Sequence, residues 1–386
     1  MKLIKLGCER MYFGEGAVQG LAELPATRKK AYIVMSGTIQ QELGQLKTVT
    51  DVLEQAGFVW KAFTDVSPDP DFDSVRRGAD DMIAFEPDWI IGFGGGSAMD
   101  AAKAMWVFYE HPEFKELADG LKPEDIKNLR KKAQLACIPT SAGTGSEGTR
   151  AAVITDAKAN VKYAVRCVQS RTVPDVAILD PAFSVTMPPS LTAASGMDAI
   201  THAIEAYTTP MANVFSDAMA IQSFRLGFKN LAACYETPED LGPRSDMLAS
   251  AYMAGVAFTN TGGLGITHSI AHTFGGVYHV PHGLANAIVL PYILRFNHED
   301  PATAERYKEL AFFVGVPCLY EAVLELNRRL NVPANLQAVV GKDEDVKARL
   351  DQLADIAMAD ISTAFSPRKP TKEQMKALIE EAYWGT

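Results

Sequence analysis

Short apolar runs alternate with amphipathic segments over the first half of the chain. The apolar runs are residues 31–35, 58–63, 88–93 and 134–138. Between them, residues 45–56 and 74–85 repeat apolar side chains at helical spacing. Short buried strands that alternate with helices form a parallel sheet covered on both faces. We therefore expect a Rossmann-like α/β domain over residues 1–185.

The pattern changes near residue 188, after which strand signals disappear. Long helical stretches such as 217–233 and 247–258 follow, and Pro and Gly residues interrupt them. We therefore expect residues 186–386 to form an all-helical domain. The boundary is expected within the proline-containing stretch 180–189.

Composition and charge restrict the class of protein. The net charge of −10 argues against non-specific binding to nucleic acids or anionic membranes. Residues 1–9 lack the apolar core of a signal peptide, and no long apolar run occurs elsewhere. The five cysteines are scattered and form no C-x-x-C pair, which is typical of a reducing compartment. We expect a cytoplasmic protein.

Two loops after predicted strands are candidates for binding phosphate. The first is Gly94-Gly-Gly-Ser97, followed by a predicted helix, and the second is Pro139-Thr-Ser-Ala-Gly-Thr-Gly-Ser-Glu147. Consecutive glycines let the backbone approach an anion, and the helix N-terminus offers free N–H groups. Loops at the carboxyl ends of parallel strands are a common nucleotide site. The alternative for the first loop is a tight strand-to-helix turn without a ligand.

The second half concentrates metal-ligand residue types. Five of the seven histidines lie between positions 202 and 282. Asp198 and His202 are four residues apart, which places both on one helix face. With His268 and His282 they form a ligand set that suits Fe, Zn, Ni or Co. The alternative is a solvated helix face or a local hydrogen bond, but the apolar surroundings of Asp198 favour a buried carboxylate with a partner.

These motifs, in this order and spacing, resemble the iron-containing (group III) alcohol dehydrogenases along essentially the full chain. The fold implied is an α/β dinucleotide-binding domain and an all-α domain, an architecture also similar to that of dehydroquinate synthase. The matching segments are 94–103, 139–147, 174–181, 195–207, 268–276 and 281–286.

The resemblance implies roles for individual residues. Asp198, His202, His268 and His282 would bind a catalytic divalent metal, Fe²⁺ or Zn²⁺. His272, one helical turn after His268, would assist proton transfer. The residues implied in binding NAD(P) are Gly95, Gly96, Ser97, Asp100, Thr140, Ser141, Thr144, Lys162 and Leu179.

The resemblance also implies the reaction. Hydride would pass between nicotinamide C4 and the carbon of a small primary alcohol or its aldehyde, with the metal acting as a Lewis acid. NAD is the first expectation, although no acid follows Met35 at the end of the first predicted strand, so NADP stays open. The positions of Ala151, Phe258 and Asn260 suggest contact with substrate. Should Arg150, Arg166 or Arg171 also reach the pocket, the substrate would be a small anionic aldehyde, such as sulfoacetaldehyde or a semialdehyde.

Three other functions remain alternatives. A glycerol-type polyol dehydrogenase shares the architecture but usually has fewer metal ligands. A dehydroquinate-synthase-like lyase needs more basic residues than surround Asp198. A non-catalytic assembly protein would not need an intact ligand set. Because residues 1–16 resemble a family segment that often pairs across a two-fold axis, we also expect a homodimer or a larger homo-oligomer.

Overall fold

The computed structural model describes residues 4–156, 161–167 and 171–385. The chain divides into two compact units, Met1–Thr186 and Met187–Thr386.

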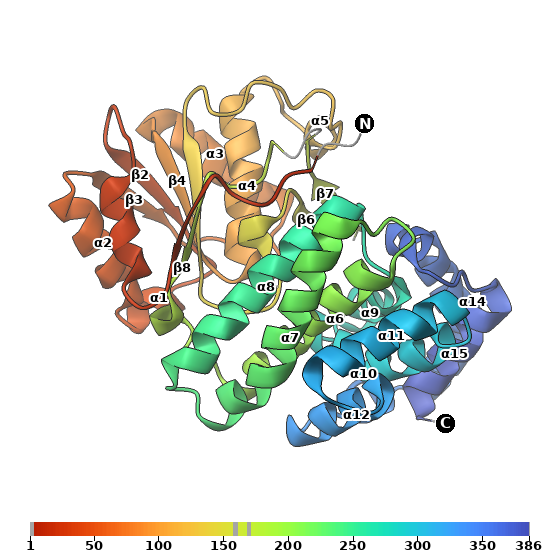
Figure 1. The fold of residues 1–386 in the computed structure, drawn as a ribbon. Helices are drawn as coiled ribbons and strands as arrows, with labels where there is room; N and C mark the ends of the chain where they lie inside the picture. The colour runs from red at the N-terminus through yellow and green to blue at the C-terminus, as the bar shows by residue number, and fades with distance from the viewer. Residues whose placement is uncertain (1–3, 157–160, 168–170, 386) are drawn as a thin grey trace. The chain divides into compact units, whose positions relative to one another are not determined.

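The first unit is built on a six-stranded parallel sheet with the strand order β1-β8-β5-β4-β2-β3 (Figure 1). Its strands are β1 (Arg10–Phe13), β2 (Lys30–Val34), β3 (Val59–Phe63), β4 (Trp89–Gly94), β5 (Gln134–Pro139) and β8 (Val176–Leu179). The four apolar runs seen in the sequence correspond to β2, β3, β4 and β5. The parallel sheet that we predicted is confirmed.

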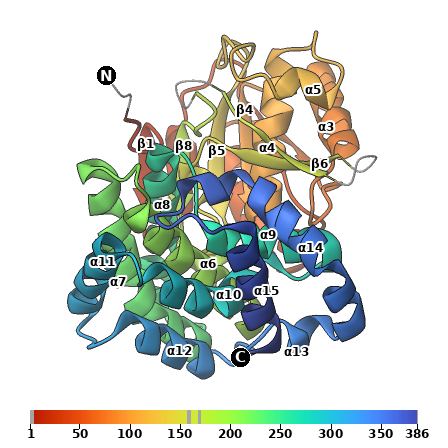
Figure 2. The same ribbon diagram turned by 90° about the vertical axis from the view of Figure 1, so that its right-hand side faces the viewer.

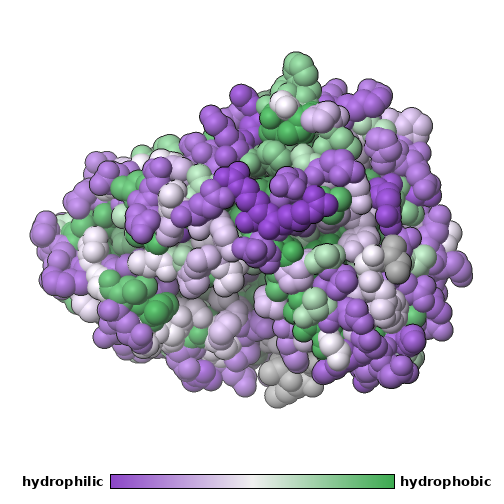
Figure 3. Space-filling view, turned by 90° about the horizontal axis from the view of Figure 1, so that it is seen from below, coloured by the Kyte–Doolittle hydropathy of each residue, from purple (hydrophilic) through white to green (hydrophobic). Residues whose placement is uncertain are grey.

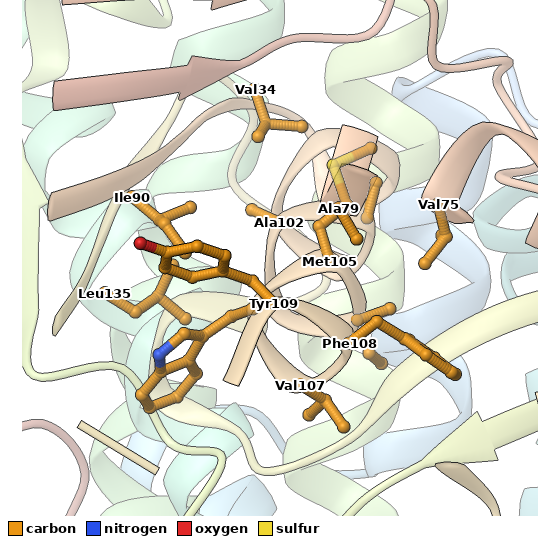
Figure 4. Close-up of a cluster of buried hydrophobic side chains, with 14 of the residues drawn as sticks. Val34, Val75, Ala79, Ile90, Ala102, Met105, Val107, Phe108, Tyr109 and Leu135 are labelled. Carbon is orange, nitrogen blue, oxygen red and sulfur yellow. The ribbon is translucent and has the colours of Figure 1, made fainter. Parts of the chain in front are cut away.

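Successive side chains of a strand point to opposite faces of the sheet. Both faces of this sheet are apolar, and helices cover each of them. Ile33 and Ile91 face a core that includes α2 (Gln45–Gln55) and the 3-10 helix η1 (Ala17–Glu23). Tyr32 and Ile90 face the opposite core, which includes α3 (Phe72–Phe85) and α4 (Gly96–Glu110). Figure 4 shows part of this second core, where Tyr109 of α4 lies against Ile90 and Leu135 of the sheet and Met105 lies beside Ala79 of α3.

The rest of the first unit consists of short elements. An antiparallel hairpin of β6 (Ala152–Asp156) and β7 (Val161–Val165) was not anticipated from the sequence. The short helical elements are α1 (Ile39–Glu42), α5 (Leu117–Gly120), η2 (Ser146–Gly148) and η4 (Pro181–Phe183).

The second unit is helical throughout its described residues, as predicted (Figure 2). Its first helices are α6 (Pro189–Thr208), α7 (Val214–Glu236), α8 (Leu241–Thr261), α9 (Ile266–Tyr278) and α10 (His282–Asn297). The later ones are α11 (Pro301–Val314), α12 (Leu319–Arg329), α13 (Gln337–Val340), α14 (Asp343–Ala359), η5 (Ile361–Phe365) and α15 (Lys372–Trp384). Side chains from α9, α10, α14 and α15 form one buried apolar cluster. This cluster supports the two helices that carry His268 and His282.

Among the described residues, no helix is both long and apolar enough to cross a membrane. Polar side chains predominate on the face shown in Figure 3, where apolar ones form small groups between them.

Candidate functional site

Four candidate metal ligands converge in the second unit. Asp198 and His202 lie one turn apart on α6, His268 lies on the first turn of α9, and His282 is the first residue of α10. The three helices pack against one another, α10 contacting both α6 and α9. One nitrogen or oxygen from each residue lies within 4.8 Å of the others. The structure therefore brings together the four residues that the sequence singled out.

The separations inside this cluster suit a metal ion. The Asp198 Oδ1 atom lies 3.4 Å from His282 Nε2, 3.5 Å from His268 Nε2 and 3.8 Å from His202 Nε2. Ligands about 2.1 Å from a tetrahedral ion are about 3.4 Å apart. One carboxylate and three imidazoles are also the donors that divalent first-row metals favour. The residues thus fit a divalent metal.

Burial and charge distinguish the four residues. Burial would raise the pKa of Asp198, but the imidazoles of His202 and His282 hold that pKa well below its ordinary range. Burial lowers the pKa of His202 to about 4, which leaves the imidazole neutral and able to donate a lone pair. The side chain of His282 is 42% exposed, whereas that of His268 is fully buried. The cluster therefore has an accessible side at His282.

Two residues that the sequence analysis did not single out complete the surroundings. Glu205 lies on α6 one turn after His202, and its Oε2 is 2.6 Å from His268 Nδ1. Asn286, one turn after His282, places Nδ2 2.8 Å from Asp198 Oδ1, 3.0 Å from His268 Nε2 and 3.2 Å from His282 Nε2. Both residues lie inside the quoted motifs, and helical spacing from a predicted ligand was the signal that could have identified them.

His272 lies beside the cluster without being part of it. Its ring stacks against that of His282, with centroids 5.2 Å apart, and its Nδ1 lies 2.8 Å from Asp360 Oδ2. The side chain is 42% exposed. Burial would raise the pKa of Asp360, but the contact with His272 lowers it to about 2. His279 ends α9 with a positive φ of 57° and does not join the cluster.

The three predicted substrate residues have different surroundings. Phe258, on α8, lies with its ring centroid 4.8 Å from that of His202, so it borders the cluster. Asn260 is buried and donates from Nδ2 to Val256 O of its own helix. Ala151 belongs to the first unit, where its carbonyl accepts from Lys103 Nζ at 3.0 Å.

The two glycine-containing loops lie at the carboxyl ends of neighbouring parallel strands, β4 and β5. Gly94 has a φ of 148°, a conformation that residues with a Cβ rarely adopt, and it turns the chain from β4 into α4. Helix α4 has no side-chain cap at its N-terminus. A Cβ on Gly96 would lie 2.8 Å from Thr144 Cγ2. The first loop therefore packs so closely against the second at this position that only glycine fits without a shift.

Exposure separates the residues within each loop. Gly95, Gly96, Ser97, Thr140, Ser141 and Thr144 are partly exposed, whereas Gly94, Ala98, Ala142, Gly143 and Gly145 are buried. The six partly exposed residues are six of the nine that the sequence analysis assigned to the cofactor. An uncapped helix N-terminus beside glycines and hydroxyl side chains fits the pyrophosphate of a dinucleotide.

Three other predicted cofactor residues lie away from this accessible surface or already have partners. Asp100 accepts from Ser146 Oγ at 2.6 Å and from Val153 N at 2.9 Å. Lys162, on β7, pairs with Asp69 at 2.5 Å. Leu179, the last residue of β8, is fully buried. Their roles toward a cofactor stay predictions.

Both units match models of known protein families. Residues 8–181 match the family described as iron-containing alcohol dehydrogenase. Residues 192–383 match the C-terminal part of the Fe-containing alcohol dehydrogenase family.

Individual relatives indicate the same family. The chain is 40% identical to an NADPH-dependent butanol dehydrogenase of Clostridium saccharobutylicum, over 97% of each chain. It is 36% identical to an aldehyde-alcohol dehydrogenase of Streptococcus pneumoniae, but spans only 45% of that longer protein. Among solved structures, an iron-containing alcohol dehydrogenase from Thermococcus thioreducens has 33% identity and a TM-score of 0.90. That comparison covers 99% of this chain and 100% of the other.

Proposed function

The chain belongs to the iron-containing alcohol dehydrogenase family. From this premise we propose which of its residues bind the dinucleotide, the metal and the substrate of an NAD(P)-linked, metal-dependent enzyme. Such an enzyme interconverts an alcohol and its aldehyde by hydride transfer. In our proposal the glycine loops of the first unit hold the dinucleotide, and the cluster of the second unit holds Fe²⁺ or Zn²⁺.

The convergence of Asp198, His202, His268 and His282 carries this proposal. A divalent metal at these residues would supply Lewis-acid polarisation of the substrate oxygen. The exposed side chain of His282 leaves the cluster accessible to substrate, and the ring of Phe258 lies next to the cluster at His202. We therefore assign Phe258 to the substrate site, while Ala151 and Asn260 stay predictions.

We assign His272 a part in proton transfer. Its contact with Asp360 fixes the ring, and its partial exposure beside His282 leaves the other nitrogen accessible to substrate or water. His272→Gln is expected to lower kcat about 10²-fold, a typical value for a positioned acid or base, while the metal content stays the same. The measurement is steady-state turnover with metal analysis. His298→Gln, at an exposed histidine outside the cluster, is the control, and full activity in His272→Gln would remove this role.

For the cofactor we propose that Gly95, Gly96, Ser97, Thr140, Ser141 and Thr144 contact the pyrophosphate and the nicotinamide end. The preference between NAD and NADP depends on the end of β2. There Ser36-Gly37-Thr38 presents no carboxylate that would repel a 2′-phosphate. The 40% identical relative is named as NADPH-dependent. Both NADH and NADPH therefore belong in every assay.

We propose small neutral primary alcohols and aldehydes as substrates, as the name of the butanol dehydrogenase suggests. The test uses protein loaded anaerobically with Fe²⁺ or Zn²⁺ and follows NADH and NADPH oxidation with butanal and with succinic semialdehyde. Butanal is expected to give the higher kcat/KM. No oxidation of NADH or NADPH with any aldehyde, while metal and cofactor bind, would favour a polyol dehydrogenase or a lyase.

One observation favours a reductase for small anionic aldehydes instead. Arg150 is partly buried beside Arg166, and burial, together with that second guanidinium, lowers its pKa. Within the described part of the chain no carboxylate pairs with Arg150, whereas Arg130 and Arg306 each pair with an aspartate. A preference for succinic semialdehyde that Arg150→Gln abolishes, while the exposed Arg225→Gln does not, would replace the neutral-substrate proposal.

We further propose a homodimer in the cytoplasm. Strand β1 lies at the edge of the sheet, pairs there with β8, and exposes Met11 and Phe13. An open strand edge of this kind can pair with a second copy. The five cysteines are all free, which agrees with a reducing compartment. A monomeric mass in light scattering would contradict the dimer.

A further inference from the structure

Glu205 makes a set of contacts behind the metal cluster. It is 6% exposed. Its Oε2 accepts from Gly265 N at 2.7 Å and lies 2.6 Å from His268 Nδ1, while Oε1 accepts from Thr267 N at 2.9 Å. One carboxylate from α6 therefore binds both the backbone at the start of α9 and the imidazole that α9 carries.

The contact with His268 has a chemical consequence. A carboxylate can only accept, so Nδ1 of His268 must carry the proton. In the neutral imidazole the lone pair of Nε2 then points at the cluster, where Nε2 lies 3.0 Å from Asn286 Nδ2 and 3.5 Å from Asp198 Oδ1. By contrast, Nδ1 of His202 has no hydrogen-bond partner among the described residues. His268 is thus held by a carboxylate in the orientation needed for a ligand, whereas His202 lacks such a partner.

We propose that Glu205 is a positioning residue for the metal centre: it fixes the tautomer and orientation of His268, and thereby sets how tightly the protein holds its divalent metal. This inference rests on the proposed metal site. Carboxylate partners of metal-bound histidines typically contribute about 10- to 100-fold to metal affinity. The backbone contacts to Gly265 and Thr267 add rigidity, because they fix the carboxylate itself.

A purely structural role is the competing explanation. A carboxylate at the N-terminus of α9 also satisfies free N–H groups and interacts favourably with the helix dipole. If that were its only role, changes at Glu205 would destabilise the metal-free protein, and the folded fraction would bind metal normally. Metal affinity measured on folded protein therefore separates the two roles.

The principal test is Glu205→Gln. The glutamine amide can donate to Nδ1 of His268, which would place the proton on Nε2, on the side where the metal has to bind. We expect the dissociation constant for Zn²⁺, measured by competition with a chelator, to rise about 10- to 100-fold. NADPH affinity should stay the same. Glu309→Gln is the matched control, because Glu309 also contacts α6, through the Tyr207 hydroxyl, but lies outside the cluster.

A second variant keeps the carboxylate and moves it. A Cβ on Gly265 would lie 2.8 Å from Glu205 Oε1, and the backbone of Gly265 has a negative φ of −117° that alanine accepts. Gly265→Ala should therefore weaken Zn²⁺ binding several-fold, even if Glu205→Gln fails to fold. Wild-type affinity in folded Gly265→Ala and Glu205→Gln would overturn the role of Glu205. Failure of the wild-type protein to bind Zn²⁺ would instead overturn the metal site itself.

Discussion

Asp198→Ala and His268→Ala are each expected to lose the bound metal and to reduce alcohol oxidation by at least about 10³-fold. Lewis-acid stabilisation by a metal is worth several kcal/mol, and each ~1.4 kcal/mol is a factor of ten in rate. Asp198 is the only carboxylate among the four proposed ligands, and its Oδ1 faces all three imidazoles. Without it, three imidazoles would have to hold a dication with no negative charge among them.

The measurement combines metal analysis of purified protein with turnover and with NADPH titration. Cofactor affinity should stay near the wild-type value, because the predicted dinucleotide loops belong to the first unit and the ligands to the second. His298→Ala, at the end of α10, is a suitable control because it removes an exposed imidazole outside the cluster. Unchanged metal content in both ligand variants would show that the four residues do not form a metal site.

The elements that the sequence predicted well are those with strong periodicity. The apolar runs of β2, β4 and β5 are buried on both faces of the sheet, so they contain almost no polar interruption. The hairpin of β6 and β7 was missed because its sequence mixes exposed and buried positions without a clear period. Strand β8 lies inside a quoted family motif but is only four residues long.

The same reasoning explains which parts of the site could be predicted. Asp198 and His202 are linked by helical spacing, which is a local signal. The pairing of Glu205 with His268 joins residues 63 positions apart, and that of His272 with Asp360 joins residues 88 positions apart. Such contacts depend on how α6, α9 and η5 pack, and one sequence contains no local pattern for them. The convergence of the four candidate ligands was therefore predictable, whereas the partners that orient their side chains were not.

The last prediction concerns the first glycine loop. Gly96→Val is expected to weaken NAD(P)H binding about 10- to 100-fold, as losing one hydrogen bond to a charged group costs ~1.5–3 kcal/mol. The new Cβ would lie 2.8 Å from Thr144 Cγ2 and 3.3 Å from Thr144 Oγ1. The two loops would have to separate, and valine methyl groups would also occupy space where the backbone is expected to approach the pyrophosphate.

Fluorescence titration with NADPH and NADH measures this effect, and metal analysis should show no change. Gly276→Val is the matched control, because a Cβ at this helical glycine of α9 meets no atom within 4 Å. A double variant that adds Thr144→Ser removes the Cγ2 atom and should restore part of the affinity if loop separation is the cause. Normal cofactor affinity in Gly96→Val would mean that the loop is only a strand-to-helix turn. The dinucleotide would then have to bind elsewhere on the first unit.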